Sequence, residues 1–112
     1  MKRSAIHRKP APPIPQESRL AVWDRAEGKC EWCGCSTWLQ FAHIKHRGLG
    51  GRHGKMLEAI HDKRNIALLC LYNHDVLDRR VWAPELRERM LVFLKDKLGW
   101  HSWAEEYGIK SP

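Results

Sequence analysis

The sequence predicts an α+β domain in which two short strands form a hairpin that leads into a helix. Two apolar runs, at residues 38–45 and 65–71, have the length and composition of strands. Four glycines in residues 47–55 mark the connection between the runs as a loop. A helical pattern follows the second run directly. Because polar side chains stand at the ends of these segments, we expect the hairpin and the helix to bring them together around one metal ion.

The composition of the chain limits the classes of protein to which it can belong. A chain of 112 residues is long enough for one domain and short for two. Lys and Arg number 20 against 13 Asp and Glu, so the net charge of +7 favours nucleic acid as a partner, with an anionic membrane surface second. No apolar run is long enough to span a bilayer and no signal peptide is visible, so we expect a cytoplasmic protein with no membrane role.

The first 16 residues are predicted to form a basic, proline-rich arm. Four prolines between positions 10 and 15 exclude a regular helix or a central strand there. Such an arm can follow a phosphate backbone or remain solvated. Residues 17–112 form the predicted domain, which starts with a helix capped by Ser18 and stopped by Gly28.

Cysteines follow this helix and recur in the second apolar run. Cys30-Glu-Trp-Cys33-Gly34 is a zinc-knuckle pattern, because two thiolates must reach one tetrahedral ion and the glycine permits the tight turn. Disulfides would need a secretory signal, and a thioredoxin-like redox pair would need a βαβ setting. We therefore predict a structural Zn²⁺, which adds folding energy that a small core lacks. Its candidate ligands are Cys30, Cys33, Cys70 and Cys35.

Apart from the second strand, the second half of the chain carries helical patterns. Residues 84–98 carry the clearest pattern, since Pro84 stands in the first turn and Gly99 follows the last. Shorter patterns cover residues 56–63 and 72–80. The basic residues between positions 79 and 97 are interpreted as a solvated helix face, and the scattered tryptophans as core. The tail aromatics expected to pack on that core are Trp100, Trp103 and Tyr107.

The candidate reactive centre consists of a base and two metal ligands. His43 ends the first apolar run, and an imidazole titrates near neutrality, so it can activate water. His74 and Asp78 are four residues apart and share a helix face, where an imidazole and a carboxylate can bind one ion. Side chains after His43 can contact phosphates. These are Lys45, His46, Arg47 and Arg52.

The order of these residues, with Gly48-Leu-Gly-Gly51 after the first histidine and cysteines on both sides, resembles the HNH family of nucleases over residues 18–80. The resemblance implies a ββα-metal (His-Me) finger with a treble-clef-like zinc knuckle, flanking helices and a C-terminal helical extension. It also implies an endonuclease that hydrolyses DNA phosphodiester bonds, nicking one strand or cutting both, as a monomer or homodimer. Its catalytic metal would be Mg²⁺ or Mn²⁺, with Zn²⁺ or Ni²⁺ as alternatives. Small members of this kind are frequent in phages, which implies the host-cell cytoplasm.

The family comparison leaves roles open at three positions. The family's asparagine either ligates the metal or ties down the loop that orients the base, and either role fits Asn65. Ala42 stands where many members have a metal-binding Asp or His, which water, Asn65 or His46 could replace. Asn73 stands where a second Cys-x-x-Cys would end. The zinc then has four thiolates including Cys35, or three thiolates and a foreign ligand, or the site has been lost.

The missing ligand at position 42 motivates a rival of a different class, a zinc-stabilised nucleic-acid-binding module without catalysis. Another zinc hydrolase is disfavoured, because the chain has neither the His-Glu-x-x-His of metalloproteases nor the His-x-Glu with Pro-Cys-x-x-Cys of base deaminases. The remaining histidines are interpreted as surface or core residues. They are His7, His53, His61 and His101.

Overall fold

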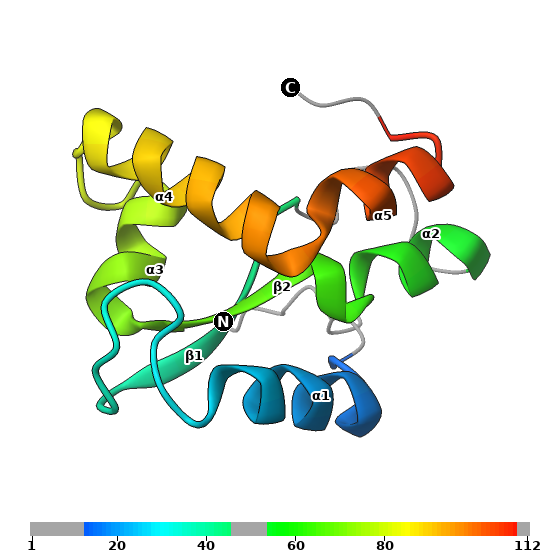
Figure 1. Cartoon of the computed structure of the whole chain (residues 1–112), viewed down its shortest axis with the longest axis horizontal. Coiled ribbons are helices and arrows are strands. Elements are labelled where there is room, and N and C mark those ends of the chain that lie inside the picture. Colours follow the sequence, from blue (N-terminus) through cyan, green and yellow to red (C-terminus); the bar gives the residue numbers. More distant parts are fainter. Residues whose placement is uncertain (1–12, 46–53, 110–112) are drawn as a thin grey trace, which may run out of the picture.

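Strands β1 (Leu39–His43) and β2 (Ile66–Cys70) pair antiparallel in the middle of the computed structural model (Figure 1). Their register runs from Leu39 opposite Cys70 to His43 opposite Ile66. The α+β class and both strands are thereby confirmed, each strand being shorter at both ends than predicted.

The structure describes residues 13–45 and 54–109. Most of the predicted arm and the glycine-rich segment lie outside the described residues. So do three of the predicted phosphate contacts, His46, Arg47 and Arg52.

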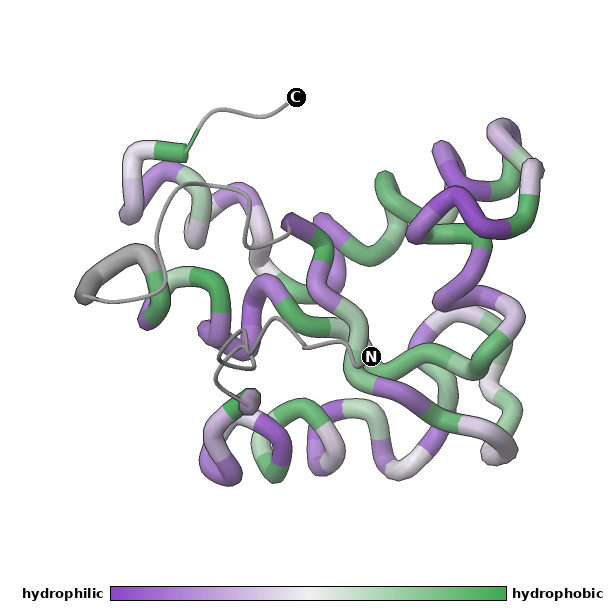
Figure 2. The backbone as a smooth tube through the Cα atoms, turned by 180° about the vertical axis from the view of Figure 1, so that it is seen from behind, coloured by the Kyte–Doolittle hydropathy of each residue, from purple (hydrophilic) through white to green (hydrophobic). Residues whose placement is uncertain are grey.

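One face of β2 packs on α1 (Gln16–Ala26). Val22 and Ala26 of this helix form a core cluster with Ile66 and Leu68. Figure 2 shows hydrophilic and hydrophobic residues alternating along α1, as expected for a helix with one buried face.

The other face of β2 packs on α3 (Leu71–Leu77) and α4 (Pro84–Leu98). Ala67 and Leu69 point to this side, because successive residues of a strand alternate between faces. They join a larger cluster that includes Ala42, Val76, Leu77, Met90, Leu94 and Leu98. The sheet is therefore the middle layer between α1 and the α3–α4 pair (Figure 1).

A third group of helices covers the end of the sheet near His43. Trp100 and Trp103 of α5 (Trp100–Glu106) are buried against Ala59 of α2 (Gly54–Ile60), and Trp103 Nε1 donates to the Ala59 carbonyl at 2.7 Å. The predicted packing of these tail aromatics is confirmed. That the tail forms a helix of its own was not predicted.

Helix boundaries differ from the predictions at several positions. The left-handed residue that ends α1 is Glu27, directly before the predicted Gly28, and the helix predicted over residues 56–63 is observed at Gly54–Ile60. Ser18 does not cap α1, which begins after Pro15; the Ser18 hydroxyl donates instead to the His61 carbonyl at 2.7 Å. The helix predicted over residues 72–80 ends earlier, so that Asp78 is its C-cap residue. The prediction for residues 84–98 is confirmed by α4, with Gly99 in the left-handed conformation.

A buried carboxylate ties the cysteine segment to the middle of β2. The Glu31 side chain accepts two hydrogen bonds from Arg25 and one from the Leu68 N–H, all at 2.8 Å. The Glu31 N–H donates to the Leu68 carbonyl at 2.8 Å, and Lys97 Nζ lies 3.3 Å from the carboxylate. Burial raises the pKa of Glu31, but the bonds from Arg25 and Leu68 outweigh it and hold the pKa below its ordinary value.

Glu31→Gln keeps the shape of this side chain and removes its charge, so it should lower the free energy of unfolding by about 3 kcal/mol. The folded-state pKa lies below 4.5. The charge therefore contributes fully above that pH, and its contribution disappears as the pH falls through the folded-state pKa. Urea denaturation from about pH 7 to about pH 3 should show a larger acid loss in the wild type than in the variant.

The matched control is Glu27→Gln, the same change at an exposed residue, which should leave unfolding unchanged. A Glu31→Gln protein as stable as the wild type at neutral pH would contradict this role.

Candidate functional site

Three cysteines from separate parts of the chain come together beside the sheet. The sulfur atoms of Cys30, Cys33 and Cys70 all lie within 4.8 Å of one another, and the Cys33 and Cys70 sulfurs are 3.9 Å apart. Zinc–sulfur bonds of about 2.3 Å in a tetrahedron place sulfurs about 3.8 Å apart. The three thiols can therefore hold a metal ion such as zinc.

The backbone of the knuckle turn positions these thiols. Gly34 adopts φ +84°, which favours glycine, and its N–H donates to the Cys30 carbonyl at 2.9 Å. The Cys30 N–H donates to the Cys35 carbonyl at 2.7 Å, closing the turn. The Cys33 N–H points at the Cys30 sulfur at 3.5 Å. The glycine predicted to permit a tight turn has this role.

The charges of the cluster match a bound cation. Burial raises the pKa of Cys30, but the Cys33 N–H and the Asn73 amide outweigh it and lower the pKa to about 7. Burial, together with the neighbouring thiols, raises the pKa of Cys33 to about 12 and also raises that of Cys70. The first thiolate forms readily, and its negative charge opposes deprotonation of the neighbouring thiols. A bound divalent cation would relieve that repulsion.

Asn73 and Cys35 lie around the three thiols. Asn73 Nδ2 donates to the Cys30 sulfur at 3.4 Å, so the residue that replaces the expected cysteine supports a thiolate. The predicted ligand Cys35 is not part of the group whose sulfurs all lie within 4.8 Å of one another. A hydrogen bond from the Thr37 backbone, and then contacts with the Cys33 and Cys70 thiols, lower the pKa of Cys35.

His74 and Asp78 meet at the C-terminal end of α3. His74 Nε2 lies 3.1 Å from Asp78 Oδ2, and its Nδ1 contacts Gln40 Oε1. Neighbouring ligands of a six-coordinate ion lie about 3 Å apart when metal–ligand distances are about 2.1 Å. The two atoms are in direct contact in the structure, and their spacing is also that of two adjacent ligands. Arg80 Nη2 lies 3.6 Å from the same carboxylate oxygen.

His43 faces a different set of neighbours. Alternation along β1 puts His43 on the side of Phe41, and Gln40 with Ala42 on the opposite side, toward α3. His43 Nε2 lies 3.4 Å from His61 Nδ1. In the described part of the chain, only the cysteine cluster brings three His, Cys, Asp or Glu ligand atoms within 4.8 Å. His43 therefore does not complete such a group with His74 and Asp78.

Asn65 is fully buried and holds the segment that follows His43. Its Oδ1 accepts from the Lys45 N–H at 2.9 Å and from Trp100 Nε1 at 3.0 Å. Its Nδ2 donates to the carbonyls of Lys45 and Ile60, each at 3.0 Å. All the polar positions of this amide are used within the protein, which favours loop anchoring over metal binding among the two roles left open.

Several residues near the site were not predicted to be there. His61 was interpreted as a surface or core residue, and it is buried. Its contact with His43 depends on packing across 18 residues, which no local pattern reveals. Gln40 could have been found, because strand alternation places it on the same side as Ala42. Arg87 and Lys95 are half-buried, so the solvated-face interpretation is wrong for them. Trp82 and Trp38 are 81% and 78% exposed, so the interpretation of the tryptophans as core is wrong for these two.

Comparison of the chain with protein-family models, curated proteins and solved structures gives no match. Over the described ranges, none of the helices is long and apolar enough to cross a membrane. Function must be inferred from the chemistry of the site itself.

We expect the purified protein to contain zinc, and Cys30→Ser to lose it and to lower the melting temperature by more than about 10 °C, because metal binding adds to folding energy. Metal content by mass spectrometry and calorimetry of both proteins check this. Ser36→Ala, an exposed change in the same turn, is the control. An unchanged melting curve for Cys30→Ser would rule out a structural metal here.

Proposed function

We propose that this protein is a metal-dependent endonuclease that hydrolyses DNA phosphodiester bonds with a ββα-metal arrangement of the HNH type. The observation that carries the proposal is the His74–Asp78 pair, 3.1 Å apart on the helix that follows β2 without a connecting loop. The paired strand ends in His43, and Asn65 holds the residue two positions beyond it. An imidazole base, an ion-binding pair and an anchoring asparagine thus occur in one hairpin–helix unit.

In this proposal His43 accepts a proton from a water molecule as that water attacks the phosphorus atom. The bond between phosphorus and the 3′ oxygen breaks, the 3′ oxygen leaves and takes a proton from solvent, and the 5′ phosphate stays on the product. The contact with His61 orients the His43 ring. The hydrogen bonds between Asn65 and Lys45 fix the backbone next to it.

His74 and Asp78 would hold a divalent ion, which when bound would neutralise negative charge on the phosphate and the leaving oxygen. Two protein ligands leave positions for water and phosphate oxygens, as Mg²⁺ and Mn²⁺ prefer. Zn²⁺ and Ni²⁺ remain alternatives. Gln40, in contact with His74 Nδ1, would fix the ring orientation.

The same proposal assigns a structural zinc to the three clustered cysteines. The fourth ligand would be Cys35, which would have to move toward the ion, or a ligand from outside the chain. The ion would join the knuckle turn to the start of α3, the helix that carries His74. Its role would be to stabilise the fold rather than to react.

A nucleic-acid-binding module without catalysis is the second candidate. It is favoured by Ala42, which is 1% exposed and packed among apolar residues where a third ligand would stand. The opposite orientations of His43 and Gln40 on β1 also favour it. Its partner would again be DNA, bound through phosphates.

Plasmid nicking in Mg²⁺ or Mn²⁺ distinguishes the two candidates. We expect the wild type to nick, and His43→Ala to lower the rate by about 10²–10⁴-fold with little loss of stability or DNA affinity, because the change removes a base and no structural ligand. His101→Ala, at an exposed histidine, is the matched control and should keep full activity.

DNA binding without nicking by the wild type in either metal would overturn the nuclease proposal and favour the binding module. A melted His43→Ala protein would contradict the assignment of His43 as a base without a structural role.

A further inference from the structure

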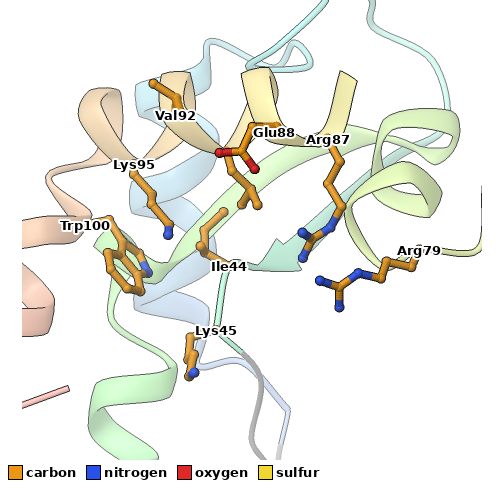
Figure 3. Close-up of a pocket in the computed structure, with 9 residues that line it drawn as sticks. Ile44, Lys45, Arg79, Arg87, Glu88, Val92, Lys95 and Trp100 are labelled. Carbon is orange, nitrogen blue, oxygen red and sulfur yellow. The ribbon is translucent and has the colours of Figure 1, made fainter. Parts of the chain in front are cut away.

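A hollow of about 300 Å³ opens between the end of β1, the segment after α3 and one side of α4 (Figure 3). Four cationic side chains line it against a single carboxylate, that of Glu88. The cations are Lys45, Arg79, Arg87 and Lys95. Such an excess of one charge in a concave site favours an anion.

Contacts with the rest of the protein hold two of these cations in place, Arg87 and Lys95. Arg87 Nε donates to the Leu77 carbonyl at 2.8 Å, and Lys95 Nζ lies 4.4 Å from the centre of the Trp100 ring. Burial, and then the charges of Arg87 and Lys45, lower the pKa of Lys95, while Glu88 opposes the effect. Burial and the charge of Arg79 lower the pKa of Arg87, opposed by Glu88 and Asp78. The cations repel one another, and a bound anion would relieve that repulsion.

Arg79 adopts a backbone conformation that costs stability. Its φ of 64° is left-handed, and the Arg80 N–H donates to the Asp75 carbonyl at 2.8 Å, the pattern of a helix end where glycine is usual. Glu27 and Trp38 share this backbone conformation, so what distinguishes Arg79 is that its side chain lines the hollow. Figure 3 shows its guanidinium group beside that of Arg87, at the edge of the hollow.

An exposed aromatic residue lies next to the cations. A second hollow, of about 260 Å³, shares Arg79, Arg87 and Glu88 with the first and is also lined by Trp82. Trp82 is 81% exposed, whereas Trp100 and Trp103 are buried. A solvent-facing indole beside cations can stack on a nucleobase whose phosphates the cations bind.

We propose that this basic hollow binds backbone phosphates of a nucleic-acid strand and that Trp82 stacks on a base of the same strand. The inference takes its partner, a nucleic acid, from the proposed function. It does not depend on cleavage of that partner. It adds a contact surface on α4 and on the segment between α3 and α4 to the phosphate contacts expected from the segment that follows His43.

The test is fluorescence anisotropy with labelled single-stranded and duplex DNA, without added divalent ions, over a range of salt. Arg79→Gly should weaken binding by about tenfold. The salt slope, which is the change of log affinity with log salt concentration, should fall by about one released counterion. The same substitution should also raise the melting temperature by a few degrees, since glycine suits the left-handed position. Trp82→Ala should weaken single-strand binding by about 10–100-fold.

Arg79→Gln removes the charge and keeps a long side chain, and it should weaken binding as Arg79→Gly does. Its matched control is Arg89→Gln, which removes one charge on α4 away from the hollow. It should bind as the wild type does. Inorganic phosphate, added alone, tests whether a small anion is the true ligand.

Wild-type affinity and salt slope in Arg79→Gly would overturn the proposal. So would equal losses in Arg79→Gln and Arg89→Gln, or tight phosphate binding that DNA does not displace. Nicking that fails while these binding differences persist would reject the nuclease proposal and leave this surface in place.

Discussion

Glu31 holds the segment between α1 and β1 against the middle of β2, and the rest of the structure is arranged around that connection. This segment carries three of the four cysteines, yet it contributes no strand to the sheet of the described residues. In place of hydrogen bonds between paired strands, the carboxylate accepts hydrogen bonds from the Leu68 N–H and from Arg25 of α1. One charged side chain therefore joins helix, knuckle and sheet. Because it is buried, removing its charge would leave the cationic groups around it uncompensated.

The two ends of β2 have different polar anchors. At one end Cys70 joins the thiol cluster, and at the other Asn65 uses its whole amide to hold the chain after β1. Between them, Ile66, Ala67, Leu68 and Leu69 are all fully buried. Such a strand has no freedom to shift its register, because a shift would expose one face and break the bonds at both ends. The residues next to its ends are therefore held precisely.

Sequence reasoning succeeded where the signal is local. Pro84 and Gly99 mark the ends of α4, and Cys30 and Cys33 stand in one short motif. It failed for Ser18, whose hydroxyl bonds to a carbonyl 43 residues away. The contact between His43 and His61 is of the same kind, because it exists only once α2 packs beside the sheet.

Tertiary packing also decided the roles of residue types that recur along the chain. Arg87 and Lys95 are eight residues apart and share one stripe of α4, as expected, but that stripe borders a hollow rather than open solvent. Six tryptophans look alike in the sequence, while Trp82 is exposed and Trp100 is buried. Periodicity gives the face of a helix on which a residue lies, and not what lies opposite that face.

Cys70 ends β2, and Leu71 begins α3, with no residue between strand and helix. The cluster thiol and His74 are four residues apart, about one helical turn or 6 Å of rise. When the proposed ion is bound, an oxidant that converts the Cys70 thiol to a disulfide or a sulfenic acid would remove one of its ligands at the residue directly before α3. The damaged ligand would then lie one helical turn from His74.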